Sequence, residues 1–475
     1  MDPATGHPGG SCGNCHARRR WCRQKLHRQF ARFRCAACGF DRLVPFSCKG
    51  RAFCPSCAGR RMVERAAHLV DHVFPRVPVR QWVLSLPPRL RYQLAWDHAL
   101  CRAVVGRTLR AILGFLRRRA REDGVQDGRS GAVAIVQRFG GALNLNVHFH
   151  ILAVDGVFVK EGEAVRFNPS PSLDAADVDD VLLTVEAYVQ RLLGGSGADA
   201  SDAGDDTLDA WADDAPVLAG LAAASVAGRA ALGPRAGARV RRRGEARATT
   251  EPPGLGPCHA RRDGFDLHAG LCVPADQRDR LERIASYALR PPVAHDRLEL
   301  TDDGQVQLTL RRPWADGTSQ LLFEPVELLE RLAALTPRPR INLILYYGVL
   351  APRAAWRSLV VQFGTAVRPG RSAGSDDAAD QDPAAAARPD GRNYHWAELM
   401  RRSMGLDVLA CPRCGGRLTL IALIEDPVVI ARFLRHLGLP HTIPEAHPAR
   451  PPPLSPCSAD LATQVTHDDL FDDPA

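Results

Sequence analysis

The sequence lacks long apolar segments. No run of about 18 apolar residues occurs in its 475 residues, so we expect no helix that crosses a membrane. The first residues, 1–14, are polar and glycine-rich, without the charged-then-apolar order of a secretory signal peptide. We therefore expect a cytoplasmic protein with no membrane partner.

Lysine is also scarce, because arginine supplies nearly all of the 62 basic residues. The formal net charge is +9 and the sequence pI is about 9.0, a balance that favours a polyanionic partner such as nucleic acid. Arg18, Arg19 and Arg20 form a cluster that could contact phosphates, although a solvated surface would show the same pattern.

The composition is otherwise that of a folded protein, with 45% hydrophobic residues and enough length for several domains. Shifts in composition divide the chain into five parts. These are a cysteine-rich module (1–76), a large central domain (77–365) with a charged insertion at about 194–262, a linker (366–394), a small C-terminal unit (395–440) and a mobile tail (441–475).

Apolar periodicity predicts the elements of the central domain. In chain order they are a strand (82–86), a long helix (92–121), two strands (133–139 and 143–154), a helix (175–193) and, after the insertion, a helix (275–289). Strand, helix, strand, strand, helix is the opening of a split βαβ unit. The predicted fold class is therefore α+β, with a ferredoxin-like core.

Two cysteine pairs predict a metal site in the N-terminal module. Cys35 and Cys38 form one CxxC pair and Cys54 and Cys57 form another, at a separation typical of zinc ribbons. Each CxxC turn directs two thiolates at one centre, and two such turns complete a tetrahedron around Zn²⁺. We predict a structural zinc on these four residues, in which Cys48 could replace one ligand.

Other cysteines leave alternatives open. An upstream group could form a second zinc site: Cys12, Cys15, His16 and Cys22. Downstream, Cys411 and Cys414 form a third CxxC pair with only two obvious ligands, to which His436 or His441 could be added.

A His-x-His pair predicts a second kind of metal site. On a strand, residues two apart share a face, so His148 and His150 can direct both imidazoles at one cation. Gln137, folded back by the turn at 140–141, is the candidate third ligand. Such a set leaves positions for phosphate and water and suits Mg²⁺ or Mn²⁺. The alternative is that both histidines lie on the solvated face of an ordinary strand.

Several stretches together resemble one family. They are 46–57 (FSCKGRAFCPSC), 81–88 (QWVLSLPP), 137–150 (QRFGGALNLNVHFH), 155–158 (DGVF), 287–292 (YALRPP), 312–317 (RPWADG) and 347–352 (YGVLAP). This combination closely resembles rolling-circle insertion-sequence transposases of the His-hydrophobic-His (HUH) tyrosine class, which also carry an N-terminal zinc module.

The resemblance implies a covalent mechanism. A tyrosine attacks a DNA phosphodiester, forms a 5′-phosphotyrosine bond and frees a 3′-hydroxyl, while the divalent metal polarises the phosphate. Tyr287 matches the nucleophile of the family, and Arg290 could hold a phosphate. Arg283 stands where some members have a second tyrosine, which implies a single-nucleophile enzyme. Tyr346 and Tyr347 are the competing candidates.

The function implied by this resemblance is DNA transposition. The enzyme would nick and rejoin single-stranded DNA at the ends of the element and transfer it to target DNA. Two alternatives stay open: a catalytically inactive zinc-dependent DNA-binding protein, and a relaxase or replication initiator with the same chemistry. The sequence predicts neither the DNA target nor an oligomeric state.

Overall fold

A computed structural model describes residues 30–45, 55–194, 210–245, 256–293, 297–338, 341–364, 396–405 and 407–436. Its largest sheet has six strands in the order β14-β4-β5-β3-β10-β9, and every neighbouring pair is antiparallel. In chain order these strands are β3 (Val79–Ser85), β4 (Gly131–Phe139), β5 (Leu145–Val154), β9 (His259–Arg262), β10 (Phe265–Val273) and β14 (Ile344–Gly348).

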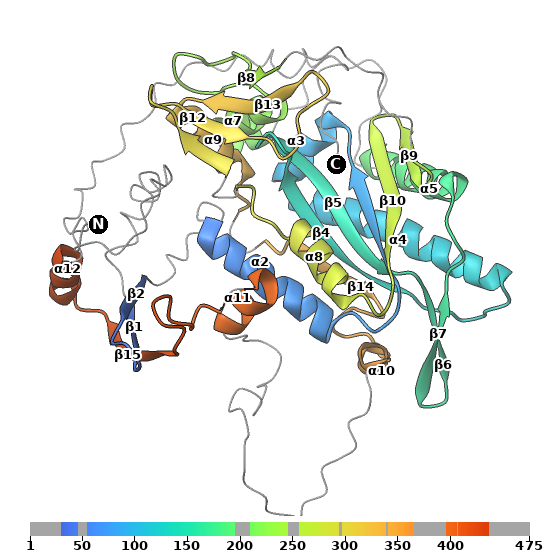
Figure 1. The fold of residues 1–475 in the computed structure, drawn as a ribbon. Helices are drawn as coiled ribbons and strands as arrows, with labels where there is room; N and C mark the ends of the chain where they lie inside the picture. Colours follow the sequence, from blue (N-terminus) through green and yellow to red (C-terminus); the bar gives the residue numbers. More distant parts are fainter. Residues whose placement is uncertain are drawn as a thin grey trace, which may run out of the picture.

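Helices cover both faces of this sheet (Figure 1). Strands β3 and β4 both pair with β5, which lies between them, and the connection from β3 to β4 runs through two helices. One face carries α3 (Pro88–Trp96), α4 (His98–Glu122) and α5 (Ala175–Gly194). The other face carries α2 (Pro55–His72) and α8 (Arg278–Ala288).

Side chains along β5 point alternately to the two faces of the sheet, so they enter two different hydrophobic cores. Val147, Phe149 and Ile151 are fully buried in the core on the α4 side, as the sequence pattern predicts. Leu152 belongs to the core on the α2 and α8 side. Since side chains two residues apart share a face, both histidines of the pair point toward α2 and α8.

The structure describes part of the charged insertion. It contains α6 (Ala210–Asp214), α7 (Pro216–Val226) and β8 (Arg241–Gly244). Strand β8 is arginine-rich, but it lies at the edge of a second sheet, where Arg241 pairs with Glu324 and Arg242 with Asp316. The composition did not predict a strand here, because the segment has so few apolar residues.

The second sheet has the order β11-β12-β13-β8. Its other strands are β11 (Leu298–Leu300), β12 (Val306–Thr309) and β13 (Thr318–Phe323), and α9 (Pro325–Leu335) follows β13 and packs on α7. A separate hairpin joins β6 (Gly156–Glu161) to β7 (Ala164–Pro169). The short helix α10 (Arg357–Gln362) ends the central part of the chain.

The two ends of the chain form one small sheet rather than the two separate units that composition predicts. Its order is β15-β1-β2, so a C-terminal strand pairs with an N-terminal one. The elements are β1 (Phe30–Cys35), β2 (Asp41–Pro45), β15 (Leu418–Ile424) and α12 (Pro427–His436). Figure 1 shows this sheet beside the central domain, with α11 (Trp396–Met404) lying next to α2. Within the described residues, no helix is long and apolar enough to cross a membrane.

Candidate active site and zinc centre

The two histidines are buried side by side on β5. His148 is 8% exposed and His150 is 4% exposed, and their ring centroids are 5.0 Å apart. Gln137 of β4 lies directly opposite His148 in the strand pairing. The solvated-face alternative is therefore wrong, because the face that carries both histidines is covered.

Hydrogen bonds fix how each imidazole is presented. His148 Nδ1 lies 2.9 Å from the backbone oxygen of Asn146, which can only accept, so Nδ1 donates and Nε2 keeps its lone pair. His150 Nδ1 lies 3.0 Å from the side-chain amide of Gln81 on β3. The contact of His148 leaves its Nε2 as the metal-binding atom. The Gln81 atom that faces His150 is Nε2, which donates to Nδ1, so His150 Nε2 is free for a metal only when the Gln81 amide turns over and presents Oε1.

Two buried polar atoms in this site have no hydrogen-bond partner among the described residues. Gln137 Nε2 donates to the backbone oxygen of Ala288 at 3.0 Å, and this leaves Gln137 Oε1 unsatisfied. His150 Nε2 is also buried and unsatisfied. Orphaned buried acceptors are costly unless a donor or a cation supplies the missing interaction. The two imidazole nitrogens and the amide oxygen thus fit a divalent cation.

Burial keeps both imidazoles neutral at physiological pH. Desolvation lowers the pKa of His148 to about 4, and the positive charge of Arg290 adds to this effect. Desolvation, together with the neighbouring His148, also lowers the pKa of His150 well below its ordinary value. A neutral imidazole is the form that binds a metal ion, so no proton has to be displaced near neutral pH.

Helix α8 brings Tyr287 to the histidines. Leu281, Ala285 and Ala288 on its apolar side are buried in the core shared with α2, which fixes the rotation of the helix. Tyr287 is 38% exposed, and its ring centroid lies 5.9 Å from that of His150 at an interplanar angle of 89°. The phenol therefore combines access to solvent with a ring contact to His150, one of the candidate metal ligands.

Arginine side chains surround the phenol. The Arg290 guanidinium lies 3.9 Å from the centroid of the Tyr287 ring, and that of Arg311 lies 5.8 Å from it. Arg311 immediately precedes the stretch 312–317 that resembles the family, but the sequence alone does not connect Arg311 with Tyr287. Two cations beside an exposed phenol provide charge for binding a phosphate.

The competing tyrosines lie elsewhere on the sheet. Tyr346 and Tyr347 on β14 pair with Val133 and Ala132 of β4, toward the end of that strand away from Gln137. Burial raises the pKa of both phenols. The arginines Arg18, Arg19 and Arg20 lie outside the described residues.

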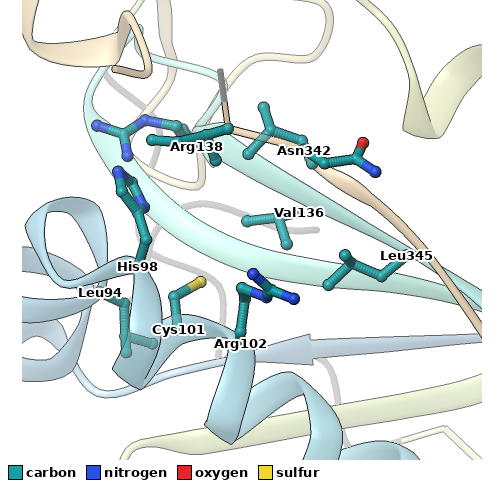
Figure 2. A pocket seen from close by; sticks show the side chains of 10 residues that line it. Leu94, His98, Cys101, Arg102, Val136, Arg138, Asn342 and Leu345 are labelled. Atoms are coloured by element: carbon teal, nitrogen blue, oxygen red, sulfur yellow. The ribbon is translucent and has the colours of Figure 1, made fainter. Parts of the chain in front are cut away.

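A small cavity on the opposite face of the sheet is a separate feature (Figure 2). Its volume is about 20 Å³, which is room for roughly one water molecule. Arg138 lines it and donates to the backbone oxygens of Ala95, Ala334 and Leu335. These contacts make Arg138 a link between the sheet and its helices, and the cavity is too small for a substrate.

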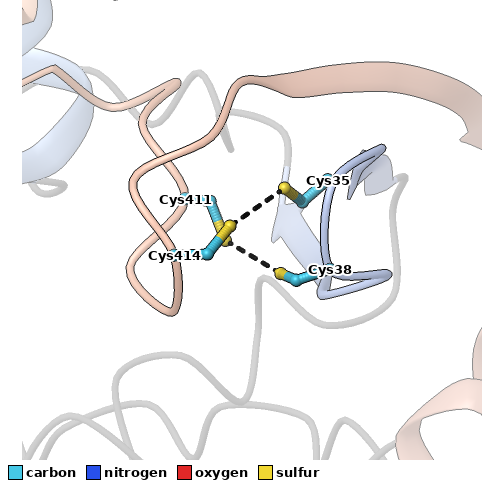
Figure 3. A group of neighbouring side chains, drawn as sticks. All are labelled: Cys35, Cys38, Cys411 and Cys414. Atoms are coloured by element: carbon cyan, nitrogen blue, oxygen red, sulfur yellow. Dashed lines mark hydrogen bonds between the residues drawn. The ribbon is translucent and has the colours of Figure 1, made fainter.

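Four cysteines meet at the small sheet formed by the chain ends (Figure 3). Cys35 Sγ lies 3.6 Å from Cys414 Sγ, and Cys38 Sγ lies 3.6 Å from Cys411 Sγ. All four sulfurs lie within 4.8 Å of one another. Although desolvation opposes ionisation, hydrogen bonds from the backbone N–H groups of Arg413 and Cys414 lower the pKa of the Cys411 thiol to about 7.

One of the two predicted cysteine pairs belongs to this cluster. Cys35 and Cys38 meet the downstream pair Cys411 and Cys414, because β15 pairs with β1 and brings its preceding turn to theirs. Cys57 is buried in the first turn of α2. Cys54 lies outside the described residues, as do Cys12, Cys15, Cys22, Cys48 and His441.

Two family models match the chain. Residues 131–357 match a family described as "Putative transposase", and residues 14–86 match a family described as "Transposase zinc-binding domain". These matches support a DNA transposase. Searches among curated proteins and among solved structures found no match.

The two matched regions divide the chain in a way that agrees with its candidate sites. The region 131–357 begins at β4 and contains Gln137, both histidines and Tyr287. The zinc-binding region 14–86 contains Cys35 and Cys38 but ends long before Cys411. The zinc-binding match and the four-cysteine cluster together support a structural Zn²⁺.

Proposed function

We propose that this transposase belongs to the HUH tyrosine class and that Tyr287 is its nucleophile. The observation that carries the proposal is the position of the Tyr287 ring against His150. The unsatisfied oxygen of Gln137 supports it, because the amide nitrogen of Gln137 donates to Ala288, the residue that follows Tyr287. Strands β4, β5, β3 and β10, with the α4 and α5 connections on one face, correspond to the ferredoxin-like core that this class implies.

The proposed metal ligands are His148, His150 and Gln137, and a bound Mg²⁺ or Mn²⁺ would polarise the scissile phosphate and stabilise its developing charge. The chain's own residues do the rest. Gln81 and the Asn146 carbonyl orient the imidazoles, and Gln137 is held by Ala288, next to the nucleophile. Arg290 and Arg311 bind the phosphate beside the phenol.

Each step of the proposed reaction exchanges one phosphoester bond for another, so the number of these bonds does not change. Tyr287 Oη loses its proton and attacks the phosphorus, an Oη–P bond forms, and the bond from phosphorus to the 3′-oxygen breaks. The 3′-oxygen takes up a proton and leaves as a free hydroxyl. The 5′-phosphotyrosine is then attacked by a 3′-hydroxyl, which rejoins or transfers the strand. The proposed substrates are single-stranded DNA at the element ends and target DNA.

The test is the detection of a covalent adduct. Purified protein is mixed with labelled single-stranded oligonucleotides from the ends of the element, with Mg²⁺ or Mn²⁺ or without added metal, and resolved on a denaturing gel. We expect a metal-dependent adduct with the wild type and with the control Tyr347→Phe. We expect at least a thousandfold less adduct with Tyr287→Phe, because the attacking oxygen is absent.

Each contrary result has a definite meaning. An adduct that persists in Tyr287→Phe and disappears in Tyr347→Phe would make Tyr347 the nucleophile. If correctly folded protein binds the end sequences but forms no adduct with any of them, the binding-only alternative replaces the enzyme. The zinc-binding match already favours a transposase over a relaxase or a replication initiator.

A further inference from the structure

The four-cysteine cluster consists of two turns with the same hydrogen bonds. In the first, Gly39 N–H donates to Cys35 O and Cys35 N–H donates to Phe40 O, both at 2.9 Å. In the second, Gly415 N–H donates to Cys411 O at 2.9 Å and Cys411 N–H donates to Gly416 O at 2.7 Å. Both sequences read CxxCG, although they stand at opposite ends of the chain.

The glycine after each pair serves the same purpose in both turns. Gly39 has φ 70° and Gly415 has φ 73°, the left-handed region that residues with a side chain rarely adopt. Space also favours glycine at Gly416, since a Cβ there would lie 3.2 Å from Cys35 Sγ and 3.3 Å from Cys414 Sγ, closer than most Cβ contacts. The second turn is thus shaped to approach the sulfurs of the first.

The sulfur separations fit tetrahedral zinc. A Zn–S bond of about 2.3 Å places neighbouring sulfurs of a tetrahedron roughly 3.8 Å apart. The two measured separations are 3.6 Å and none of the others exceeds 4.8 Å. A disulfide would require about 2.05 Å, and all four cysteines are free thiols.

The sheet around the cluster has little apolar core of its own. Its main apolar cluster joins Phe30 of β1 to Ile424, Ile430 and Leu434 of the C-terminal segment. Leu420, Ile421 and Leu423 of β15 are about half exposed. Small units with so few buried side chains usually depend on a metal or a disulfide for their stability.

We propose that one Zn²⁺, bound by Cys35, Cys38, Cys411 and Cys414, joins the two ends of this chain into a single zinc ribbon. The second ligand pair then lies outside the region that matches the zinc-binding family. Zinc holds the C-terminal strand against the N-terminal strand, so neither end forms the module without the other. This proposal does not depend on the nuclease mechanism.

The test measures zinc, not DNA cleavage. Full-length protein purified with Zn²⁺ is analysed for metal content by mass spectrometry under native conditions, and Co²⁺-substituted protein is examined for thiolate-to-cobalt charge-transfer absorption. We expect Cys414→Ala and Cys35→Ala each to lose one equivalent of zinc. The control Cys258→Ala should lose none, because this partly buried thiol lies outside the cluster.

A rescue variant separates ligation from folding. Cys414→His keeps a zinc-binding side chain at the same position, so we expect it to retain the ion and to change the cobalt spectrum to that of a three-thiolate site. Unchanged zinc content in both Cys414→Ala and Cys411→Ala would overturn the proposal. The proposal would also be overturned if Cys57→Ala and Cys35→Ala each lost the same zinc ion while Cys414→Ala retained it fully.

Discussion

At the scale of single residues, Gln81 is the feature of the site that sequence reasoning missed. It lies within a stretch that resembles the family, but nothing in that stretch connects it with His150. The connection comes from the pairing of β3 with β5, which places Gln81 opposite Leu152 and within reach of the imidazole. Its side chain is 7% exposed, so this contact is made away from solvent.

We predict that Gln81→Leu weakens metal binding without removing any ligand. Side chains that orient a metal-binding imidazole typically contribute 10–100-fold to metal affinity, and we expect an apparent affinity for Mn²⁺ lower by about that factor. The measurement is the Mn²⁺ dependence of adduct formation. The rate at saturating Mn²⁺ should recover to within a few-fold of the wild type.

The control for Gln81→Leu is Gln190→Leu, on α5 at the opposite face of the sheet. It should leave the metal dependence unchanged. A Gln81→Leu protein whose activity fell equally at all Mn²⁺ concentrations would show that Gln81 acts on folding or on the substrate, not on the imidazole.

At the scale of elements, helix α11 braces α8, the helix that carries the proposed nucleophile. Arg402 on α11 donates to Asp71 of α2 at 2.6 Å and to Glu282 of α8 at 2.7 Å. The two carboxyl groups raise the pKa of the Arg402 guanidinium. One arginine thus links α11 to both helices that cover the histidine face of the sheet.

We predict that Arg402→Gln destabilises this face and slows cleavage. Loss of the cation leaves Asp71 and Glu282 without their shared partner, and we expect a loss of about 1–2 kcal/mol, since the group is partly exposed. Thermal unfolding should report this loss, and adduct formation by Tyr287 should slow by a few-fold. The neighbouring Arg401→Gln is the control. Equal stability of the two variants would contradict a bracing role.

Several elements were predictable because their signals are local. The helices predicted at 175–193 and 275–289 were confirmed to within three residues at each end as α5 and α8, since their apolar periodicity matches the faces that they bury. The helix predicted at 92–121 was only partly right. Asp97 adopts an extended conformation (φ −82°, ψ 96°) and its side chain accepts from Leu100 N–H, which ends α3 and begins α4.

The pairing of β15 with β1 was not predictable in the same way. Cys411 and Cys414 form a zinc-binding CxxC pattern. Which other residues complete the site depends on which strands lie next to each other in the folded protein. Cys38 and Cys411 are separated by 373 positions, and no periodicity or spacing operates over such a distance. The same limit applies to Gln81 and His150, and to Arg311 and Tyr287.

At the scale of the whole molecule, the small sheet closes the chain on itself. The N-terminal strand β1 and the C-terminal strand β15 pair along six residues of β1, and the central domain lies between them in sequence. A covalent break in the predicted linker at 366–394 would therefore leave two fragments that are still held together by the proposed zinc site and by Arg402.

We predict that a protein cleaved at a protease site inserted in this linker remains a complex while zinc is bound. The two fragments should elute together in size-exclusion chromatography. Chelation or Cys414→Ala should weaken their association, because only the pairing of β15 with β1 and the Arg402 contacts then remain. An uncleaved sample treated with the same chelator controls for aggregation. If the zinc-loaded fragments separated, the proposed link between the N-terminal and C-terminal strands would be wrong.

The distance in sequence between the two cysteine turns has a consequence for synthesis. A ribosome adds about 5–20 residues per second, so Cys35 and Cys38 wait on the order of half a minute before Cys411 emerges. During that time the first turn is half a binding site. A gene copy that is truncated or frameshifted before its last hundred codons yields a polypeptide that cannot complete it, so stable zinc uptake would distinguish intact copies from damaged ones.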